Sequence, residues 1–225
     1  MSEATEQRQA EAARPGVSPA GGACWGCAST VPAAEPFCPA CGQVQPPGQS
    51  DHFTRLGLAR TAEPDPAELD RRYFALQRRL HPDRFAARPA REKAISQAQA
   101  TSLNEAYRTL REPLARAAYL VRLCGGRLDG ENGRTVDDPV LLMEAMEMRE
   151  ALAEAATPAE IATLRARADG EIASCRAAFA AALETSALDA AARLVLRWTY
   201  LAKLAEETRR KGLGAAAGAA AGGAA

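Results

Sequence analysis

The chain has 225 residues, of which 47% are hydrophobic but only 5% aromatic, and its 28 basic and 28 acidic side chains give a formal net charge of zero. This length suits one ordinary domain with small attachments or two small domains, and the alanine-rich composition favours an all-α fold with thin Leu/Ala cores. The balanced charge argues against binding of nucleic acid through overall positive charge, and no run of about 18 apolar residues could span a membrane. We therefore expect a soluble helical protein with neither nucleic-acid nor membrane partners.

Four cysteines near the N-terminus form the first motif. Residues 1–22 carry acidic side chains and no apolar core, so we expect a disordered tail that is neither a secretory signal nor a transit peptide. Residues 23–45 then hold two C-x2-C pairs separated by ten residues, and this spacing lets two tight loops present four thiolates to one metal ion. Such a small segment has no core, so metal binding would supply its folding free energy. The predicted ligands of a closed, structural Zn²⁺ site are Cys24, Cys27, Cys38 and Cys41.

Other uses of these cysteines stay open. The same ligand set would hold iron in a rubredoxin-like site, and paired thiols also form disulfides or redox centres. Disulfides suit a secreted chain, which the N-terminus does not indicate. A nucleic-acid role is disfavoured because residues 20–50 contain no lysine or arginine. Whether this four-cysteine module contacts the helices that follow is left open by the sequence.

A helical hairpin is predicted within residues 51–123. Its first long helix begins at Asp65-Pro66, an N-cap followed by proline at the first helical position, with Glu68 as a capping-box acid. This helix stops before Pro82, and a second long helix spans about residues 91–111. Each helix has one apolar stripe, formed by Leu69, Tyr73, Leu76 and Leu80 on the first and by Leu103, Ala106, Tyr107 and Leu110 on the second.

The loop between these helices is the strongest candidate for function. The chain contains only two histidines, which argues against an active site built on histidine. One histidine stands in the tripeptide His81-Pro82-Asp83, which the proline places on a loop beside a cationic helix face. We expect this surface to contact a partner rather than to catalyse a reaction. Its residues are His81, Pro82, Asp83, Arg71, Arg72, Arg78 and Arg79.

Residues 136–211 are predicted to form an antiparallel bundle of three helices. The first helix begins at Asp138-Pro139 and runs to about residue 156. The second begins at a capping box formed by Thr157 and Glu160 and runs to about residue 183. The third is predicted to begin with Ser186 and Asp189, and residues 212–225, which are glycine and alanine with one leucine, to form a disordered tail. The apolar stripe expected on the third helix is Leu188, Ala192, Val195, Thr199 and Ala202.

The first helix of this bundle has two apolar faces. One face, which includes Leu141 and Leu152, is the natural core side at about 100° per residue. The opposite face mixes apolar groups with carboxylates, as protein-binding faces do, and methionine tolerates partners of different shape. Packing of this face on another helix of the bundle is the alternative that the pattern leaves open. The residues of the second face are Leu142, Met143, Met146, Glu147, Glu150 and Glu154.

The residues around the tripeptide resemble the J-domain co-chaperones. The resemblance rests on Phe53-Thr54-Arg55-Leu56-Gly57-Leu58, the basic helix, His81-Pro82-Asp83 and Leu103-Asn104-Glu105-Ala106-Tyr107. It implies that the loop and the basic helix dock on a 70-kDa heat-shock chaperone and stimulate its ATP hydrolysis, while the protein itself hydrolyses nothing. Arg84 stands where lysine is more usual in the family, which keeps the charge but alters its geometry.

From about residue 51 to residue 210 the chain resembles the HscB (Jac-type) co-chaperones of iron–sulfur cluster assembly. The matching segments are 111–117, 142–150 and 200–204. The sequence around the four cysteines resembles that of the eukaryotic branch of the family. The resemblance implies that the bundle binds the cluster scaffold IscU and delivers it to an HscA/DnaK-class chaperone. Tyr200 stands where the family often has phenylalanine. The implied scaffold contacts are Leu142, Met143, Met146, Glu147, Glu150, Glu154 and Tyr200.

The expected protein is therefore a non-enzymatic adaptor that brings a scaffold to a chaperone. One alternative is a general J-domain co-chaperone with another client, and a second, ranked below it, is a four-cysteine iron or redox protein. The N-terminal residues and the Ala/Arg-rich composition favour a bacterial cytoplasm. The mitochondrial matrix is the alternative compartment, because the four-cysteine module resembles eukaryotic relatives.

Overall fold

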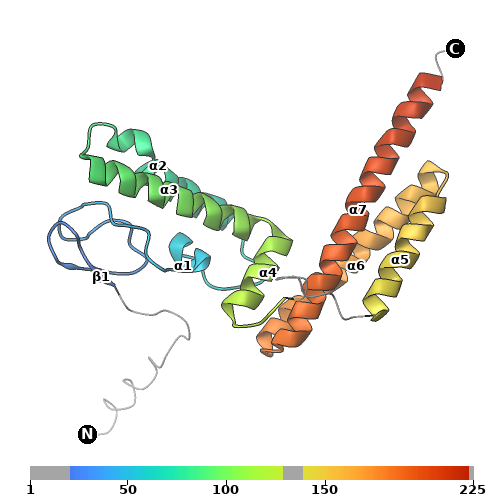
Figure 1. Cartoon of the computed structure of the whole chain (residues 1–225), viewed down its shortest axis with the longest axis horizontal. Coiled ribbons are helices and arrows are strands. Elements are labelled where there is room, and N and C mark those ends of the chain that lie inside the picture. The colour runs from blue at the N-terminus through green and yellow to red at the C-terminus, as the bar shows by residue number, and fades with distance from the viewer. Residues whose placement is uncertain (1–20, 129–138, 223–225) are drawn as a thin grey trace, which may run out of the picture. The chain divides into compact units, whose positions relative to one another are not determined.

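The computed structural model describes residues 21–128 and 139–222 and confirms the all-α prediction with a small four-cysteine module. Within these residues the only strands are β1 (Gly22–Ala23) and β2 (Thr30–Val31), which pair antiparallel. In the same part of the chain no helix is long and apolar enough to cross a lipid bilayer. The helices, labelled in Figure 1, are α1 (His52–Leu56), α2 (Pro66–Leu80), the 3₁₀ helix η1 (Pro82–Phe85), α3 (Ala90–Arg111), α4 (Pro113–Leu123), α5 (Pro139–Glu154), α6 (Pro158–Glu184) and α7 (Leu188–Gly222).

Two compact units divide the chain, and they differ from the predicted domains. The first unit contains residues up to Arg60 together with Pro64–Arg108, and the second contains Thr61–Glu63 and the residues from Thr109 onward. The four-cysteine module, predicted as a separate domain over 23–45, thus shares a unit with α1, α2 and most of α3. Helix α4, predicted to close the J domain at residue 123, belongs instead to the second unit because it packs against α7.

Local sequence signals set the ends of α2. The Asp65 carboxylate accepts a hydrogen bond from the backbone N–H of Ala67 at 3.0 Å, which caps the helix as predicted. The expected capping box is absent there, because Glu68 turns to Arg71 and Arg72 and forms ion pairs with both. At the other end the Ser96 hydroxyl donates to the carbonyl of Leu80 at 2.8 Å, which satisfies one of the last carbonyls of the helix.

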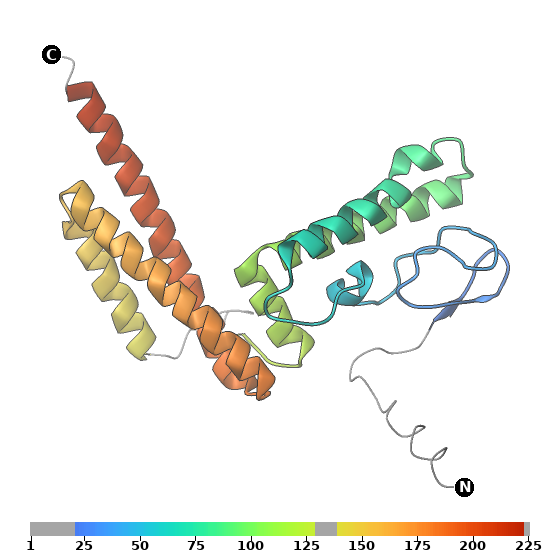
Figure 2. The ribbon, with the colours of Figure 1, turned by 180° about the vertical axis from the view of Figure 1, so that it is seen from behind.

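Helices α2 and α3 lie side by side and antiparallel in both ribbon views (Figures 1 and 2). Their predicted stripes are buried, with only Leu76 left partly exposed, and all of these residues except Leu110 belong to the first unit. Tyr73 and Tyr107 stack across the pair with ring centroids 3.9 Å apart. Their hydroxyls donate to Asn104 and Asp70 respectively, so the two buried rings keep partners for their polar ends.

We expect Leu103→Ala to destabilise the first unit by roughly 2–5 kcal/mol, the usual cost of emptying a well-packed leucine site. Leu103 is 1% exposed, so little solvent can fill the space that it leaves. The measurement is urea unfolding followed by circular dichroism, with Leu76→Ala as the matched control on the neighbouring helix. Because Leu76 is partly exposed, the control should lose less, and equal losses would contradict this account of the core.

The second unit holds the short segment 61–63 through a buried arginine. The Arg116 guanidinium on α4 donates to the carbonyl of Ala62 at 2.8 Å and lies 3.3 Å from the Glu63 carboxylate. Arg176 on α6 approaches the same carboxylate at 2.9 Å. Burial lowers the pKa of Arg116 from its ordinary value, and Glu63 opposes that shift. One carboxylate therefore joins segment 61–63 to α4 and α6.

Helix α6 begins as predicted, whereas α7 does not. The Thr157 hydroxyl accepts from the backbone N–H of Glu160 at 3.2 Å, and the Glu160 carboxylate accepts from that of Thr157 at 2.9 Å, so the capping box is confirmed. Ser186 does not cap α7, because it adopts a left-handed conformation (φ 56°) and its N–H bonds the carbonyl of Leu183. It therefore ends α6, and α7 begins at Leu188.

The apolar stripe of α7 differs from the prediction as well. Of the five predicted positions only Val195 is buried. The large side chains of Trp198, Leu201 and Leu204 occupy the core, and they set which face of the helix turns inward. Over residues 188–213, the part of α7 whose side chains are described, the other buried residues are Ala191, Ala205 and Thr208.

At the C-terminus the structure departs from the predicted disordered tail. Helix α7 continues to Gly222, and residues 223–225 lie outside the described part of the chain. Alanine has the highest helix propensity, and adding residues to a helix that already exists avoids the cost of nucleation. The predicted N-terminal tail over 1–22 lies outside the described residues except for its last two, and Gly22 starts β1.

Candidate functional site

Two similar turns carry the four cysteines. In the first, the N–H of Ala28 donates to the carbonyl of Cys24 at 2.9 Å, and in the second the N–H of Gly42 donates to the carbonyl of Cys38 at 2.8 Å. Ala28 and Gly42 both have positive φ, at 61° and 74°, which folds the backbone around the preceding sulfurs. Pairing of β1 with β2 and an isolated bridge between Phe37 and Val44 hold the two turns together.

The four sulfurs gather at one point, as the spacing predicted. All four Sγ atoms lie within 4.8 Å of one another, with 3.6 Å between Cys24 and Cys41 and 3.7 Å between Cys27 and Cys38. A tetrahedral zinc ion with sulfurs at about 2.3 Å separates them by about 3.8 Å, so the cluster fits such an ion. Four protein thiolates leave no open coordination position, which makes a structural role the natural one.

The surroundings of Cys24 favour its thiolate form. Burial raises the pKa of this thiol, but hydrogen bonds from the backbone N–H groups of Gly26 and Cys27 and contacts with neighbouring thiols lower it to about 6. The side-chain amide of Gln45 also donates to Cys24 Sγ at 3.3 Å. A metal ion binds the thiolate, so these donors prepare Cys24 as a ligand.

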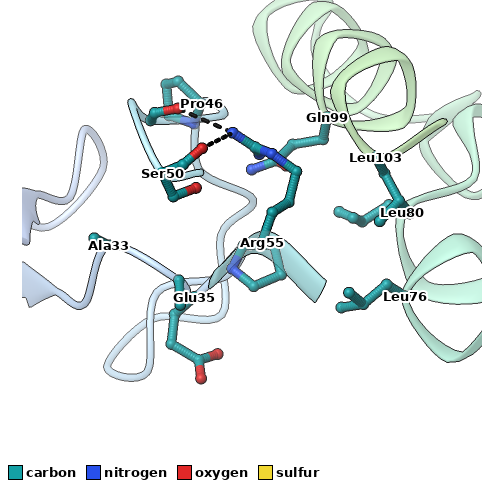
Figure 3. A pocket seen from close by; sticks show the side chains of 12 residues that line it. Ala33, Glu35, Pro46, Ser50, Arg55, Leu76, Leu80, Gln99 and Leu103 are labelled. Carbon is teal, nitrogen blue, oxygen red and sulfur yellow. Dashed lines mark hydrogen bonds between the residues drawn. The ribbon is translucent and has the colours of Figure 1, made fainter. Parts of the chain in front are cut away.

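The module packs on the helical hairpin, a question that the sequence left open. Gln45 is buried, and its backbone carbonyl accepts from the Gln99 side chain of α3 at 2.7 Å. Figure 3 shows Arg55 of α1 at this seam, where it donates to the carbonyls of Gly48 and Ser50. The space between these groups is about 20 Å³, room for roughly one water molecule, so the seam is a packed contact and not a ligand pocket.

Two aromatic side chains of the module extend this contact through arginines. The Arg79 guanidinium of α2 lies 4.8 Å from the ring centroid of Phe37, and that of Arg91 on α3 lies 4.3 Å from the ring of Trp25. The Trp25 indole N–H donates to the carbonyl of Val44 at 2.7 Å. Aromatic residues beside metal ligands were the available sequence signal, but nothing in the sequence paired them with these arginines.

The predicted docking loop is exposed at the tip of the hairpin. His81 follows the last residue of α2, and Pro82 opens η1, so the break occurs where proline predicted it. The His81 imidazole Nδ1 accepts from the N–H of Asp83 at 3.3 Å and lies 3.6 Å from its carboxylate. Asp83 has a side chain that is 89% exposed, and a partner can therefore reach the whole loop.

The arginines predicted to guide docking divide into two pairs. Arg71 and Arg72 both form ion pairs with Glu68, which neutralises part of their charge. Arg78 and Arg79, two residues and one residue before the end of α2, are exposed and have no carboxylate within ion-pair distance among the described residues. The unbalanced positive charge of α2 therefore lies next to His81.

On α5 the predicted second face is exposed. Met143 and Met146 are 64% and 63% exposed, and Leu142 is 38% exposed. Glu147, Glu150 and Glu154 are exposed beside them. The core side also agrees with prediction, because Leu141 and Leu152 are buried. Packing of the second face inside the bundle, the alternative from the pattern, is thus wrong for these residues.

Tyr200 and Val140 complete the description of this face. Tyr200 is half-buried on α7, three residues after Arg197, whose guanidinium lies 2.9 Å from the Glu144 carboxylate of α5. Arg197 also pairs with Glu171 of α6 at 3.1 Å, so this part of α7 lies near both other helices of the bundle. Val140, which sequence reasoning did not single out, is 68% exposed three residues before Met143 and extends the apolar surface.

The chain is similar to known co-chaperones in both sequence and fold. The family described as the HSCB C-terminal oligomerisation domain matches residues 137–209. The iron–sulfur cluster co-chaperone protein HscB homolog of Arabidopsis thaliana is 34% identical over 195 residues, which cover 86% of this chain and 76% of that relative. The crystal structure of human co-chaperone protein HscB has a TM-score of 0.76 at 30% identity, over 84% of this chain and 97% of its own.

A further solved structure extends the likeness to a bacterial protein. The chaperone HscB from Vibrio cholerae has a TM-score of 0.67 at 32% identity, over 74% of this chain and 99% of its own. Both structures cover nearly all of their own length, so the likeness is not confined to one unit of the fold. With a curated relative at 34% identity across most of both sequences, the chain belongs to the HscB family of iron–sulfur cluster co-chaperones.

Proposed function

We propose that this co-chaperone is a non-enzymatic adaptor that stimulates the ATPase of an HscA/DnaK-class chaperone and delivers an IscU-type iron–sulfur scaffold to it. The observation that carries the proposal is that an HscB-family chain exposes two separate surfaces with the residues expected of protein-binding sites. One is the loop His81–Asp83 with its arginines, in the first unit. The other is the acid-rimmed apolar face of α5, in the second.

The mechanism follows from placing both surfaces on one chain. The loop and the arginines Arg78 and Arg79 engage the ATP-bound chaperone, with the positive charge aiding encounter. The α5 face binds the scaffold through Leu142, Met143 and Met146, and its carboxylates set the orientation. Holding both partners on one molecule raises the concentration of scaffold at the chaperone, so scaffold binding and ATP hydrolysis become coupled.

Zinc is our proposal for the metal. The closed set of four thiolates suits Zn²⁺, which has no redox chemistry, and the fold of the module would depend on it. The metal supplies a rigid crosslink between the two cysteine turns. Gln45, Phe37 and Trp25 then present the crosslinked module to the helical hairpin.

The experiment that tests the adaptor function is steady-state ATP hydrolysis by the chaperone with this protein alone, with the scaffold alone and with both. The adaptor mechanism requires stimulation by both together to exceed the sum of the separate effects. Stimulation that ignores the scaffold would assign the bundle another client. A chaperone that does not respond to this protein would remove the J-domain part of the proposal.

We expect the double change Met143→Ser and Met146→Ser to weaken scaffold binding by roughly ten- to a hundredfold, because exposed apolar anchors carry most of the energy of such faces. Both side chains are exposed, so the fold should tolerate the change. The measurement is the dissociation constant from isothermal titration calorimetry. Phe74→Ser is the matched control, since Phe74 is also exposed and apolar but lies on α2. Equal losses in both variants would contradict the assignment of the α5 face.

A further inference from the structure

A groove separates the four-cysteine module from the tip of the helical hairpin, next to the docking loop. Its volume is about 740 Å³, within the range of sites that hold ligands or peptide side chains. The module supplies one wall with Phe37, Pro39 and Cys41, and the hairpin supplies the other with Arg79, Arg84 and Arg88. Both walls belong to the first unit. The groove therefore exists only because the module packs on the hairpin.

The open side of the groove is positively charged. Arg84 and Arg88 are exposed, and within residues 21–128 and 139–222 the structure gives neither of them an ion pair. This contrasts with Arg71 and Arg72, which share Glu68. Of the two acidic residues in the lining, Glu92 is only 8% exposed, whereas Glu35 is exposed. Three exposed arginines, Arg79, Arg84 and Arg88, therefore outnumber the one exposed carboxylate, and the net charge of the opening is positive.

Apolar side chains beside the arginines of the lining indicate a peptide rather than a nucleic acid. Phe85 and Val44 are buried below the opening, and Phe37 stands at its edge with its ring against Arg79. A polyphosphate backbone would gain nothing from these apolar groups. A peptide that carries carboxylates and apolar side chains can satisfy both kinds of lining.

We propose that this groove binds an acidic segment of the chaperone that docks on His81–Asp83. The inference rests on the proposed function and adds the four-cysteine module to the chaperone-binding surface. Arg84 follows Asp83 directly, so a chaperone seated on the loop continues into the groove without a break. Carboxylates of the segment pair with Arg84 and Arg88, while its apolar side chains contact Phe37 and Pro39.

The first test measures the dissociation constant of the zinc-loaded full-length protein for the chaperone, with the groove changed on each wall. Arg88→Ala and Phe37→Ala should each weaken binding by roughly three- to tenfold, the effect typical of one charged or apolar interface contact. The matched control is Arg108→Ala, an exposed arginine of α3 that does not line the groove. Circular dichroism and metal content confirm that each variant keeps its fold. Unchanged dissociation constants in both groove variants would overturn the inference.

A crosslinking experiment tests the groove without weakening it. A photoreactive amino acid at Pro39, an exposed residue of the module wall, should form a covalent adduct with the chaperone. The same residue at Thr30, exposed on β2 and outside the groove, should not. Adduct formation at Thr30 and none at Pro39 would overturn the inference.

Competition with defined probes identifies the chemistry of the occupant. A glutamate-rich peptide should displace the chaperone from the wild type, whereas displacement by oligothymidylate alone would overturn the choice of a peptide. The proposed function fails in a different way from this inference. If the wild type neither binds nor stimulates the chaperone, the adaptor function is wrong. If it does both and the groove variants match it, only the groove assignment is wrong.

Discussion

The change His81→Gln is expected to return chaperone ATP hydrolysis to its unstimulated rate, a loss of the whole effect of this protein. The side chain of His81 is half exposed and makes only local contacts within its own loop, with the N–H and carboxylate of Asp83. Glutamine keeps the size and polarity of the side chain but not the imidazole ring. Because the end of α2 is held by Ser96 and not by His81, the loop should keep its place in the variant.

The other histidine of the chain provides the control for this prediction. His52→Gln makes the same chemical change at the start of α1, and burial there lowers the pKa of His52, which keeps its ring neutral near pH 7. This variant should stimulate the chaperone as the wild type does. Steady-state phosphate release measures both. Full stimulation by the His81 variant would contradict the role of the loop, and equal losses in both variants would point to a general effect on the fold.

Removal of the metal is expected to unfold the four-cysteine module while α2 and α3 stay helical. The module has two strands of two residues each, and its core consists of Cys24, Val31 and Cys38, so the ligands are themselves most of the core. Zinc contributes about 10–16 kcal/mol to the folding of small structural sites, far more than these few contacts can supply. Chelation should therefore open the module to chymotrypsin at Trp25 and Phe37.

Two cysteine variants separate the metal site from other thiol effects. Cys24→Ser should reproduce the chelated state, because it removes one of four ligands from a buried position. Cys124→Ser changes an exposed cysteine outside the cluster and should leave protease resistance and metal content as in the wild type. Metal analysis should find one zinc ion per chain. A coloured protein that contains iron would contradict zinc, and a module that resists protease after chelation would contradict the metal-dependent fold.

Signals within a few residues of each other predicted most of the helices. The caps at Asp65 and Thr157 and the proline break at Pro82 each act on backbone groups nearby, so they could be read without knowledge of the rest of the fold. The start of α7 could not be predicted in this way, because Ser186 adopts the left-handed conformation that ends α6 and does not cap the next helix. Its core face includes the buried Trp198, and the Arg176 guanidinium of α6 lies 6.0 Å from the centroid of that ring, a contact far away in the sequence.

The site residues show the same division between local and long-range information. The spacing of Cys24, Cys27, Cys38 and Cys41 dictates their convergence, since each pair lies within one turn. Helical periodicity placed Met143 and Met146 opposite Leu141, but their exposure required the structure, because the pattern allowed the same face to pack on another helix. The contact between Gln45 and Gln99 joins residues 54 positions apart, and a glutamine in the sequence does not indicate which residue it will contact. For that reason the seam between the module and the hairpin, and the groove beside it, required the structure.

Gln45 links the metal site to the helical hairpin, and this link has a thermodynamic consequence. Its side chain donates to the metal ligand Cys24, and its carbonyl accepts from Gln99 of α3. The folding of the four-cysteine module and the folding of the hairpin are therefore linked through this residue. A ligand that binds only the folded form of one element then stabilises whatever that form packs against. The free metal concentration is thus a variable in the melting temperature of α2 and α3, and a folded hairpin in turn tightens the affinity of the cysteines for their ion.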